Sequence, residues 1–247
     1  GGQLLIPTSD DTGNVGAILA ENAQVSEQDV SFGQTTIDTY TYSSKLIRVS
    51  FQLLQDAFFP LETWLAERLG ERIGRIVNTH FTTGDGSSKP YGIVTGASLG
   101  KTGAAGQTTT IIYNDLVDLE HSIDPSYRVG SAFMMSDAAL KTLKKLVDGQ
   151  SRPLWQPGLT VGEPSTILGY PYYINQDVAV PAASAKSLLF GRLEKYYWRD
   201  VQGIQVMRLS ERYSDYLQVG FMAFARAGGR LIDAGTDPVK YYQHPAS

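Results

Sequence analysis

The sequence predicts an α+β protein, and three features carry this prediction. Residues 35–49 alternate between apolar or aromatic and polar side chains, which is typical of an extended strand. Residues 61–81 have apolar side chains at spacings of three and four, which indicates one long amphipathic helix. From residue 187 onward, β-like segments follow one another and are separated by turn residues.

The composition is that of an ordinary folded protein and excludes several classes. The chain has 247 residues, 42% of them hydrophobic and 19% charged, and its apolar runs are far shorter than the ~18–20 residues of a membrane span. It has no cysteine, which excludes disulfides, thiolate metal sites and cysteine nucleophiles. A net charge of -4 argues against tight DNA recognition, which needs clustered Lys and Arg. Because the chain begins Gly1-Gly2, we expect a processed or truncated N-terminus.

Residues 13–50 are expected to form a long β-ribbon. Residues 15–19 read as a second strand that pairs with residues 35–49, with a polar tip between them. The alternation places one set of side chains on a common face: Tyr40, Tyr42, Ser44, Leu46 and Arg48. A two-stranded ribbon with few large apolar residues is marginal in water. We therefore expect this ribbon to lie on another subunit.

The long helix is expected over residues 60–81. Pro60 suits its first position, and Ser50 is expected to cap a shorter helical turn that ends at Ala57. A helix of this length is roughly 33 Å long and would form the backbone of an elongated molecule. Gly84 and Gly86 are expected to end it.

The remaining segments indicate a mixed α/β region. Residues 95–110 are small and flexible and are interpreted as a boundary or mobile loop. Asn114 and Ser136 are expected to cap two helices, and a buried strand precedes Ser136. Residues 151–175 are rich in proline and glycine and are expected to be loop that finishes in a strand.

No pattern of catalytic or metal-binding residues is found. The three histidines, His80, His121 and His244, have no second ligand at metal spacing and are interpreted as solvent-facing or capping residues. No G-x-S-x-G motif is present, and no Ser/His/Asp set can be singled out. We therefore predict no catalytic residue, no metal and no cofactor.

The glycine-rich stretch HFTTGDGSSKPYGI, residues 80–93, raises the question of a phosphate site. A phosphate-binding P-loop precedes a helix and ends in G-K-[ST], whereas this loop follows a helix and Lys89 is followed by Pro90. Asp85 is its only carboxylate, too few for a calcium loop. We interpret the stretch as a helix stop and chain reversal that uses the positive φ of glycine. A nucleotide-binding enzyme that uses Gly84–Gly86 remains the alternative from another class.

Several motifs in a fixed order resemble the major capsid protein family of tailed bacteriophages, which has the Hong Kong 97 fold. They are TTGDGSSKPYGI, SRPLWQPG, PSTILGYPYYIN and FARAGGRLID, and the resemblance runs from about Glu21 to Tyr242. The residues that serve as the fold signature are Gly84, Asp85, Gly86, Pro90, Gly92, Trp155, Pro157 and Gly158.

The resemblance implies a domain organisation. Residues 1–12 would be the remnant of an N-terminal arm and 13–50 the extended loop. Residues 51–110 would form the peripheral domain with its spine helix at 60–81, and 111–195 an axial α/β domain. Residues 196–247 would hold the strands that return to the peripheral domain and the C-terminal part. Subunit contacts are expected from the ribbon and from the turn at 210–216, through Tyr40, Tyr42, Lys45, Glu211, Arg212, Tyr213 and Asp215.

The resemblance also implies partners. The chain would be the head protein of a bacteriophage or prophage, with no catalytic activity. Hexamers and pentamers would close an icosahedral shell around double-stranded DNA, without sequence-specific contacts. Scaffold, protease and portal proteins would be further partners, with assembly in the bacterial host cytoplasm and no membrane.

Two departures and one alternative accompany the resemblance. The family usually has an N-terminal arm, and because this sequence starts just before the ribbon, we expect most of the arm to have been cut away or not included. Some members form a covalent cross-link, but the three corresponding positions are Val25, Leu217 and Phe224, so this chemistry is not expected. The alternative within the fold is an encapsulin, a shell that holds cargo enzymes, and gene neighbours would distinguish the two.

Overall fold

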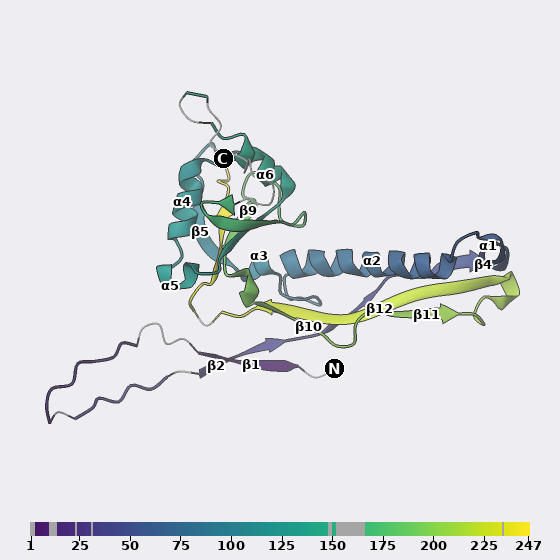
Figure 1. The fold of residues 1–247 in the computed structure, drawn as a ribbon, viewed down its shortest axis with the longest axis horizontal. Coiled ribbons are helices and arrows are strands. Elements are labelled where there is room, and N and C mark those ends of the chain that lie inside the picture. Colours follow the sequence, from purple (N-terminus) through teal and green to yellow (C-terminus); the bar gives the residue numbers. More distant parts are fainter. Residues whose placement is uncertain are drawn as a thin grey trace. The chain divides into compact units, whose positions relative to one another are not determined.

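The computed structural model describes residues 3–9, 14–22, 24–30, 32–147, 150–151, 166–233 and 235–247. The chain divides into two compact units. Unit 1 consists mainly of Ile37–Thr95 and Tyr197–Arg230, and unit 2 mainly of Leu5–Thr36, Gly96–Tyr196 and Leu231–Ser247. Figure 1 shows that both units contain helices and strands, so the predicted α+β class is confirmed.

Unit 1 is built around one long strand, β12 (Gln218–Leu231). It belongs to a five-stranded sheet in which β3 (Tyr40–Ser43), β4 (Ile47–Ser50) and β11 (Gln205–Leu209) pair antiparallel with it, and β10 (Tyr196–Asp200) pairs with it as well. Alternate residues of β12 are buried on one face of the sheet. They are Val219, Phe221, Ala223, Ala225 and Ala227.

The long helix α2 (Leu61–Thr83) packs on this face. Its buried side chains recur every four residues, at Leu61, Leu65, Leu69 and Ile73, and they join the cluster that β12 supplies. Figure 1 shows α2 lying along β12. The predicted helix is therefore confirmed, except that it ends two residues later and that Pro60 is the N-cap residue instead of the first helical residue.

A short helix, α1 (Phe51–Asp56), precedes α2 and follows β4 directly. The Ser50 side chain accepts a hydrogen bond from the Leu53 backbone N–H at 3.3 Å, which confirms the predicted cap. Because α1 ends at Asp56, residues 57–60 connect it to α2.

Unit 2 contains a six-stranded sheet. Its order is β5 (Ser98–Thr102), β13 (Val239–Gln243), β9 (Lys186–Gly191), β6 (Ala132–Met135), β8 (Tyr170–Ile174) and β7 (Thr166–Ile167). The β5–β13 and β6–β8 pairs are parallel, and the others are antiparallel.

Helices α4 (Tyr113–His121) and α6 (Asp137–Lys144) contribute the apolar residues that pack with this sheet. Unit 2 also contains the short helix α5 (Pro125–Arg128) and a 3-10 turn at Leu193–Lys195. The short helix α3 (Ile93–Gly96) lies at the boundary of the two units, and a second 3-10 turn, Ser214–Tyr216, belongs to unit 1. The largest fully buried side chains of this core include Phe133, Phe190 and Tyr242.

Residues 95–110 were interpreted as a boundary or a mobile loop, and the boundary is confirmed, because the two units divide after Thr95. A loop throughout is wrong, because residues 98–102 form strand β5, which pairs with β13 in spite of its small side chains. The last strand, β13, pairs with β9 and β5 and thus belongs to the sheet of unit 2. One predicted helix cap is also wrong. Asn114 lies inside α4, whose N-cap is Ile112, because the Asp115 carboxylate accepts the Ile112 backbone N–H at 3.1 Å.

Ser136 is the N-cap residue of α6, as predicted, but its side chain does not cap the helix. Its hydroxyl is buried and has no hydrogen-bond partner within the described residues. The backbone carbonyl of Ser136 instead accepts the Leu140 N–H at 3.0 Å, the ordinary first bond of the helix.

The predicted ribbon has different strands from those expected. β1 (Leu4–Ser9) pairs with β2 (Phe32–Ile37), whereas residues 14–22 and 24–30 contain no strand, so a strand at 15–19 is wrong. The single strand expected over 35–49 is divided among β2, β3 and β4, because β3 and β4 pair with β12.

Candidate functional site

The glycine-rich loop closes on itself directly after α2. The Gly84 backbone N–H donates to His80 O at 2.9 Å, and the Gly92 N–H donates to Gly84 O at 2.9 Å. A Cβ on Gly84 would overlap the carbonyl oxygens of His80 and Pro90, and one on Gly92 would lie 2.6 Å from the Thr82 carbonyl. Gly84 has a φ of -58, so the prediction of a positive φ is wrong there, and close backbone approach explains the glycine instead.

Gly86 is the glycine of this loop with a positive φ, +82. It lies over the ring of Tyr91, and a Cβ on Gly86 would be 2.5 Å from that ring. The Arg230 guanidinium carbon lies 5.4 Å from the centre of the same ring, on the strand β12 that runs beside the loop. The loop is therefore fixed to unit 1 through Tyr91.

The charged side chains of this loop, Asp85 and Lys89, pair with groups of the same loop. The Asp85 carboxylate accepts the Ser87 backbone N–H at 2.9 Å and lies 3.2 Å from Lys89 Nζ. The Ser87 amide and then the Lys89 ammonium hold the pKa of Asp85 below its usual value. A phosphate would have to displace the carboxylate from both groups, and the carbonyl end of α2 offers it no favourable dipole. The geometry thus supports a chain reversal and gives no support to a nucleotide site.

Tyr42, predicted to contact another subunit, instead packs in the core of unit 1. Its ring is 6% exposed, and its hydroxyl oxygen lies 3.2 Å from Nδ1 of His80 on α2. Burial, and secondly Tyr40, raises the pKa of Tyr42 to about 12. Tyr40 packs half-buried against the same core. Burial, and secondly Lys89, lowers the pKa of His80. The ring of Tyr42 is therefore part of the core and does not form the predicted interface surface.

Lys45, the third ribbon residue of that prediction, is exposed because the chain bulges between β3 and β4. The buried Ser44 hydroxyl accepts the Ala223 backbone N–H at 2.8 Å and donates to Lys45 O at 2.9 Å. Lys45 has a φ of +64, a conformation uncommon for a residue with a side chain. The bulge shifts the alternation, so that Val49 and Tyr42 are both buried while Arg48 is exposed.

The turn at 210–216 presents the other predicted interface residues. Glu211, Arg212 and Asp215 are exposed, whereas Tyr213 is half-buried. The Tyr213 ring has the guanidinium carbons of Arg48 and Arg212 at 5.5 Å from its centre. Tyr213 therefore anchors the turn, and the three charged residues remain available at the surface.

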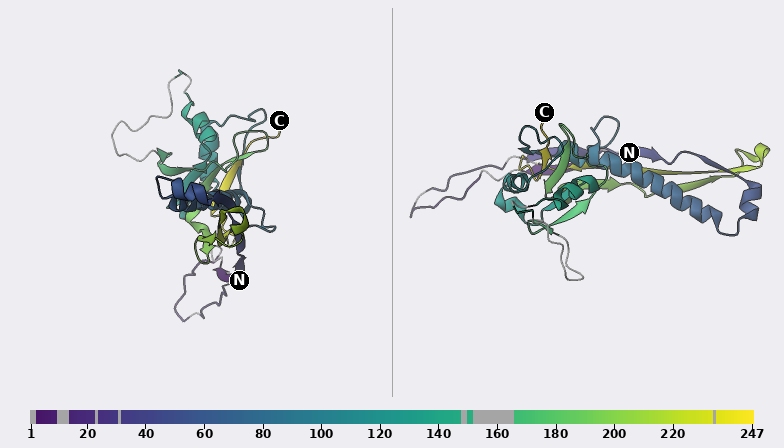
Figure 2. Two further views of the ribbon diagram at one scale, coloured as in Figure 1. Left: turned by 90° about the vertical axis from the view of Figure 1, so that its right-hand side faces the viewer. Right: turned by 90° about the horizontal axis from the view of Figure 1, so that it is seen from above.

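Residues 14–30 form an open loop beyond β1 and β2, as both views in Figure 2 show. The Gln28 amide donates to Asn14 Oδ1 at 2.5 Å, which joins the two arms of the loop. Its larger apolar side chains are exposed: Val15 79%, Ile18 103%, Leu19 53%, Val25 68% and Val30 38%. None of the described residues of the loop, 14–22 and 24–30, covers these side chains.

The connection before α2 and the first turn of this helix carry three aromatic side chains that no predicted site includes. Phe58 is 97% exposed, and the Phe59 and Trp64 rings beside it are 39% and 44% exposed. The run AFFPLETW, in which two phenylalanines directly precede the helix start, was the available signal. Aromatic residues just before a helix are typical of a hydrophobic staple, in which the ring packs against the first turn. The pattern therefore predicts buried rings and does not indicate their exposure.

The histidines do not form a reactive site. His244 is 1% exposed, so the prediction of a solvent-facing or capping role is wrong for it. Its Nε2 lies 2.8 Å from the Ser187 hydroxyl and its Nδ1 2.9 Å from Gln107 O. This Ser–His pair is completely buried, so it holds β9 to the C-terminal segment and cannot reach a substrate. Within the described ranges, no group of three His, Asp or Glu residues could hold a metal ion.

The remaining predicted positions add no chemistry. Val25 and Leu217 are largely exposed and Phe224 is half-buried, and none has a group that could form an isopeptide bond. Trp155, Pro157 and Gly158 lie outside the described residues. Among the helices of the described ranges, none has the length and hydropathy needed to cross a membrane.

Comparison with solved structures identifies the class of protein. The capsid of a native GTA particle, computed with C5 symmetry, matches with a TM-score of 0.84 and 26% identity over 99% of this chain and 85% of that chain. The capsid of the empty GTA particle matches with a TM-score of 0.80 and 25% identity, over 98% and 85% of the two chains. A structure from Microbacterium phage Oxtober96 has a TM-score of 0.74 at 16% identity, over 99% and 86%, and thus shows a shared fold.

The fold is therefore that of capsid shell proteins, as the resemblance to the Hong Kong 97 type implied. The model of the phage capsid family matches residues 1–243, and the chain belongs to this family. It is a major capsid protein, a structural component of a virion. No curated protein matches the sequence significantly.

Proposed function

We infer that this chain assembles into hexamers and pentamers of a closed icosahedral shell, in which residues 14–30 of each subunit lie across a neighbouring subunit. The observation that carries this proposal is the exposure of Val15, Ile18 and Val25 in a loop that cannot cover them itself. Exposed apolar side chains gathered in one segment are typical of an interaction surface.

The charge of the same loop supports a contact with another chain. Residues 14–30 contain Glu21, Glu27 and Asp29 and no Lys or Arg, so the loop is acidic throughout. The Lys45 side chain and the exposed Arg212 provide positive charge on unit 1. Opposite charges on two surfaces of one chain favour association of copies over aggregation in random orientations.

Unit 1 is proposed to be the peripheral domain and unit 2 the axial domain of the subunit. The long helix packed on the long strand β12 makes unit 1 suited to form the wall between capsomers. The exposed turn at 210–216 would meet other capsomers through Glu211, Arg212 and Asp215. The mixed sheet of unit 2 would lie near the capsomer centre.

The shell is proposed to enclose double-stranded DNA without sequence-specific contacts. A net charge of -4 is compatible with enclosing DNA and unfavourable for binding it tightly. Scaffold, protease and portal proteins are proposed as partners during assembly in the host cytoplasm, and the chain itself is proposed to have no catalytic role. The capsid of the GTA particle to which this chain is similar was computed with C5 symmetry, and C5 is the symmetry expected of a pentamer.

Negative-stain electron microscopy and sedimentation velocity of the full-length protein test the proposal. The expected result is closed particles of uniform size at high protein concentration. A chain that sediments only as a monomer over the same concentration range would contradict it. Gene neighbours provide a second test, since terminase, portal and protease genes are expected beside a phage capsid gene and a cargo enzyme beside an encapsulin gene.

A further inference from the structure

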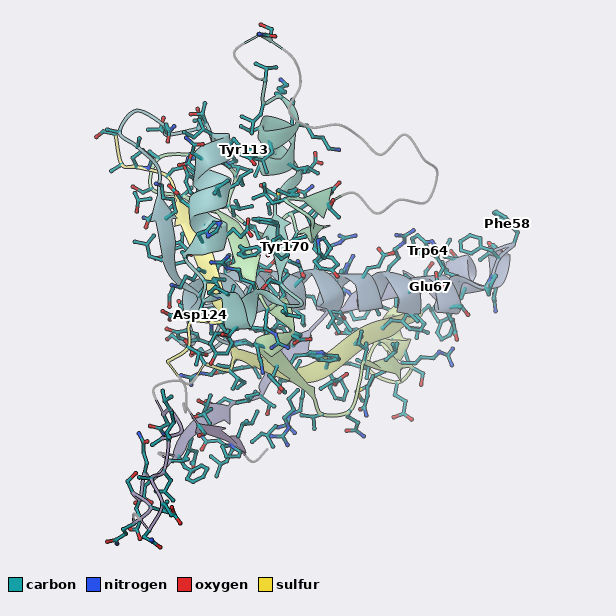
Figure 3. All side chains as sticks on the ribbon, turned by 60° about the vertical axis from the view of Figure 1, so that its left-hand side comes forward. Phe58, Trp64, Glu67, Tyr113, Asp124 and Tyr170 are labelled. Carbon is teal, nitrogen blue, oxygen red and sulfur yellow. The ribbon has the colours of Figure 1, made fainter. Side chains whose placement is uncertain are left out.

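The connection between α1 and α2 projects an aromatic side chain into solvent. Phe58 is 97% exposed, and Figure 3 shows it at the outer end of this helix pair. Its ring contacts Phe59 edge-on, with 5.1 Å between centroids and 76° between planes, and Phe59 contacts Trp64 at 6.4 Å. The Arg68 guanidinium carbon lies 5.4 Å from the centre of the Trp64 ring. Phe58 is thus the outermost of three aromatic rings that contact one another in sequence, Phe58, Phe59 and Trp64, and the other two rings hold it in place.

A groove of about 480 Å³ lies beside this row, within unit 1. Its walls are formed mainly by α1, the connection and the first turn of α2, and they comprise Phe51, Leu54, Gln55, Phe59, Pro60, Leu61, Glu62, Thr63 and Arg208. The Phe58 side chain does not line it. Polar and apolar atoms contribute about equally to the wall. The Arg208 side chain lies 3.2 Å from the Glu62 carboxylate, and both side chains are about half exposed.

We propose that Phe58 of one subunit inserts into this groove of a second copy of the chain and forms a contact between subunits in the shell. The inference rests on the proposed function, because it names the partner surface for one end of unit 1. An aromatic side chain that packs against the apolar part of this groove, which Phe51, Leu54 and Phe59 supply, buries a large area, and aromatic residues dominate the binding energy of many interfaces.

A second copy is the occupant that the charges favour. Asp56 is the last residue of α1, two residues before Phe58, so an inserted Phe58 would bring the Asp56 carboxylate close to the groove. The wall of the groove includes Arg208, whose half-exposed guanidinium is paired with Glu62 and has further N–H groups for a second carboxylate. Opposite charges at the edge of an apolar contact set its orientation. Because Phe58 and the groove belong to one chain, each copy can insert its Phe58 into one neighbour and accept the Phe58 of another neighbour in its own groove. Such a head-to-tail contact closes into a ring when its rotation allows.

The absence of native cysteine permits a direct test. One chain carries Phe58→Cys and a second, size-tagged chain carries Gln55→Cys or Thr63→Cys on the groove wall. Both are assembled as a minority among unmodified chains, whose Phe58 side chains keep assembly intact, and the particles are then oxidised. A disulfide between the two chains is expected, at a yield at least about tenfold above the control pair of Phe58→Cys with Val129→Cys. Val129 is a matched control because it is 78% exposed and lies in unit 2. Disulfides need Cα atoms within about 7 Å, so the cross-link reports close approach.

A yield no higher than that of the control pair at both groove positions, in particles of normal size, would overturn the inference and leave the proposed shell intact. Cross-links of Phe58→Cys to a cysteine at Ile18 of the loop, in place of the groove, would also overturn it. Failure of the unmodified chain to assemble would instead contradict the proposed function. As a second measurement, Phe58→Ala is expected to weaken assembly at least about tenfold, whereas Phe58→Tyr retains it. Equal assembly of both variants and the unmodified chain would count against the contact.

Discussion

The hydroxyl of Tyr42 on β3 lies 3.2 Å from Nδ1 of His80 on α2, across 38 residues of sequence. This contact joins the sheet of unit 1 to the last turns of its long helix, just before the glycine-rich loop begins. The two rings are 5.6 Å apart and tilted by 47°. The polar end of an otherwise buried tyrosine is thereby satisfied, as buried hydroxyl groups require.

The stability of the chain is expected to depend on Tyr42 at high pH. Its pKa is raised from 10.0 to about 12, so the folded state keeps the proton that the unfolded state loses. The free energy of unfolding is therefore unaffected by this group below pH 10 and falls by about 1.4 kcal/mol per pH unit as the pH rises from 10 to 12. Burial also raises the pKa of Tyr40, Tyr170 and Tyr242, so the slope that belongs to Tyr42 is the difference between the unmodified chain and Tyr42→Phe in urea unfolding at a series of pH values.

Tyr42→Phe removes both the hydrogen bond and this pH dependence. At pH 8 the variant is expected to be about 1 kcal/mol less stable than the unmodified chain. The difference should vanish near roughly pH 11, where the loss from ionisation equals the lost hydrogen bond. Tyr216→Phe serves as control, because that side chain is 68% exposed. It should change neither the free energy of unfolding at pH 8 nor its dependence on pH. A constant difference between Tyr42→Phe and the unmodified chain up to pH 12 would show that the raised pKa is wrong.

A pair of glycine substitutions tests the closed loop after α2. Gly92→Ala would place a Cβ 2.5 Å from Gly84 N and 2.6 Å from the Thr82 carbonyl, and backbone atoms cannot give way cheaply. We expect it to lower the free energy of unfolding by about 2–3 kcal/mol. Gly74→Ala, in the middle of α2 with open space around the new Cβ, should raise it by about 0.5–1 kcal/mol. Thermal unfolding that moves in the same direction for both variants would contradict the packing argument.

The bulge at Ser44 gives a third test. Its hydroxyl accepts the buried Ala223 backbone N–H at 2.8 Å, and Ser44→Ala would leave that donor unsatisfied in the core. The expected cost is about 1–3 kcal/mol in the free energy of unfolding. Ser43→Ala removes an exposed hydroxyl that accepts the Lys45 N–H at 3.3 Å, and a change below about 0.5 kcal/mol is expected. Equal unfolding midpoints for the two variants in urea would argue against the role of Ser44.

The periodic elements could be predicted from sequence because each repeats one pattern over many residues. The long helix showed its apolar stripe from Leu61 to Ile73, and the packing of Leu65 and Leu69 on β12 only confirmed it. β12 likewise buries every second residue from Phe221 to Ala227. The motif order around Gly84 and Gly92 identified the family, although the reason for Gly84 was close approach and not a positive φ.

The failures have a common physical cause, which is that pairing partners are distant in sequence. The alternation of residues 35–49 contains no sign that Ser44 would accept a bond from Ala223 and shift the register, so Tyr42 was assigned to a surface and is buried. β5 has too few apolar side chains to be recognised as a strand, and its parallel pairing with β13 decides its structure. The exposure of Phe58 could not be predicted for a different reason. A single aromatic residue before a helix gives the same sequence pattern whether its ring is buried or exposed.

The loop at residues 14–30 provides the decisive test of assembly. Ile18→Asp removes an apolar side chain that is 103% exposed, so the folded subunit should lose less than about 0.5 kcal/mol of stability. If this side chain is buried against a neighbouring subunit, the introduced charge must lose its water there, and particle yield should fall at least about tenfold. Gln24→Asp, an exposed change in the same loop that adds the same charge, should assemble nearly as well as the unmodified chain. Sedimentation velocity gives the yield, and equal yields for the two variants would show that the loop is not a subunit contact.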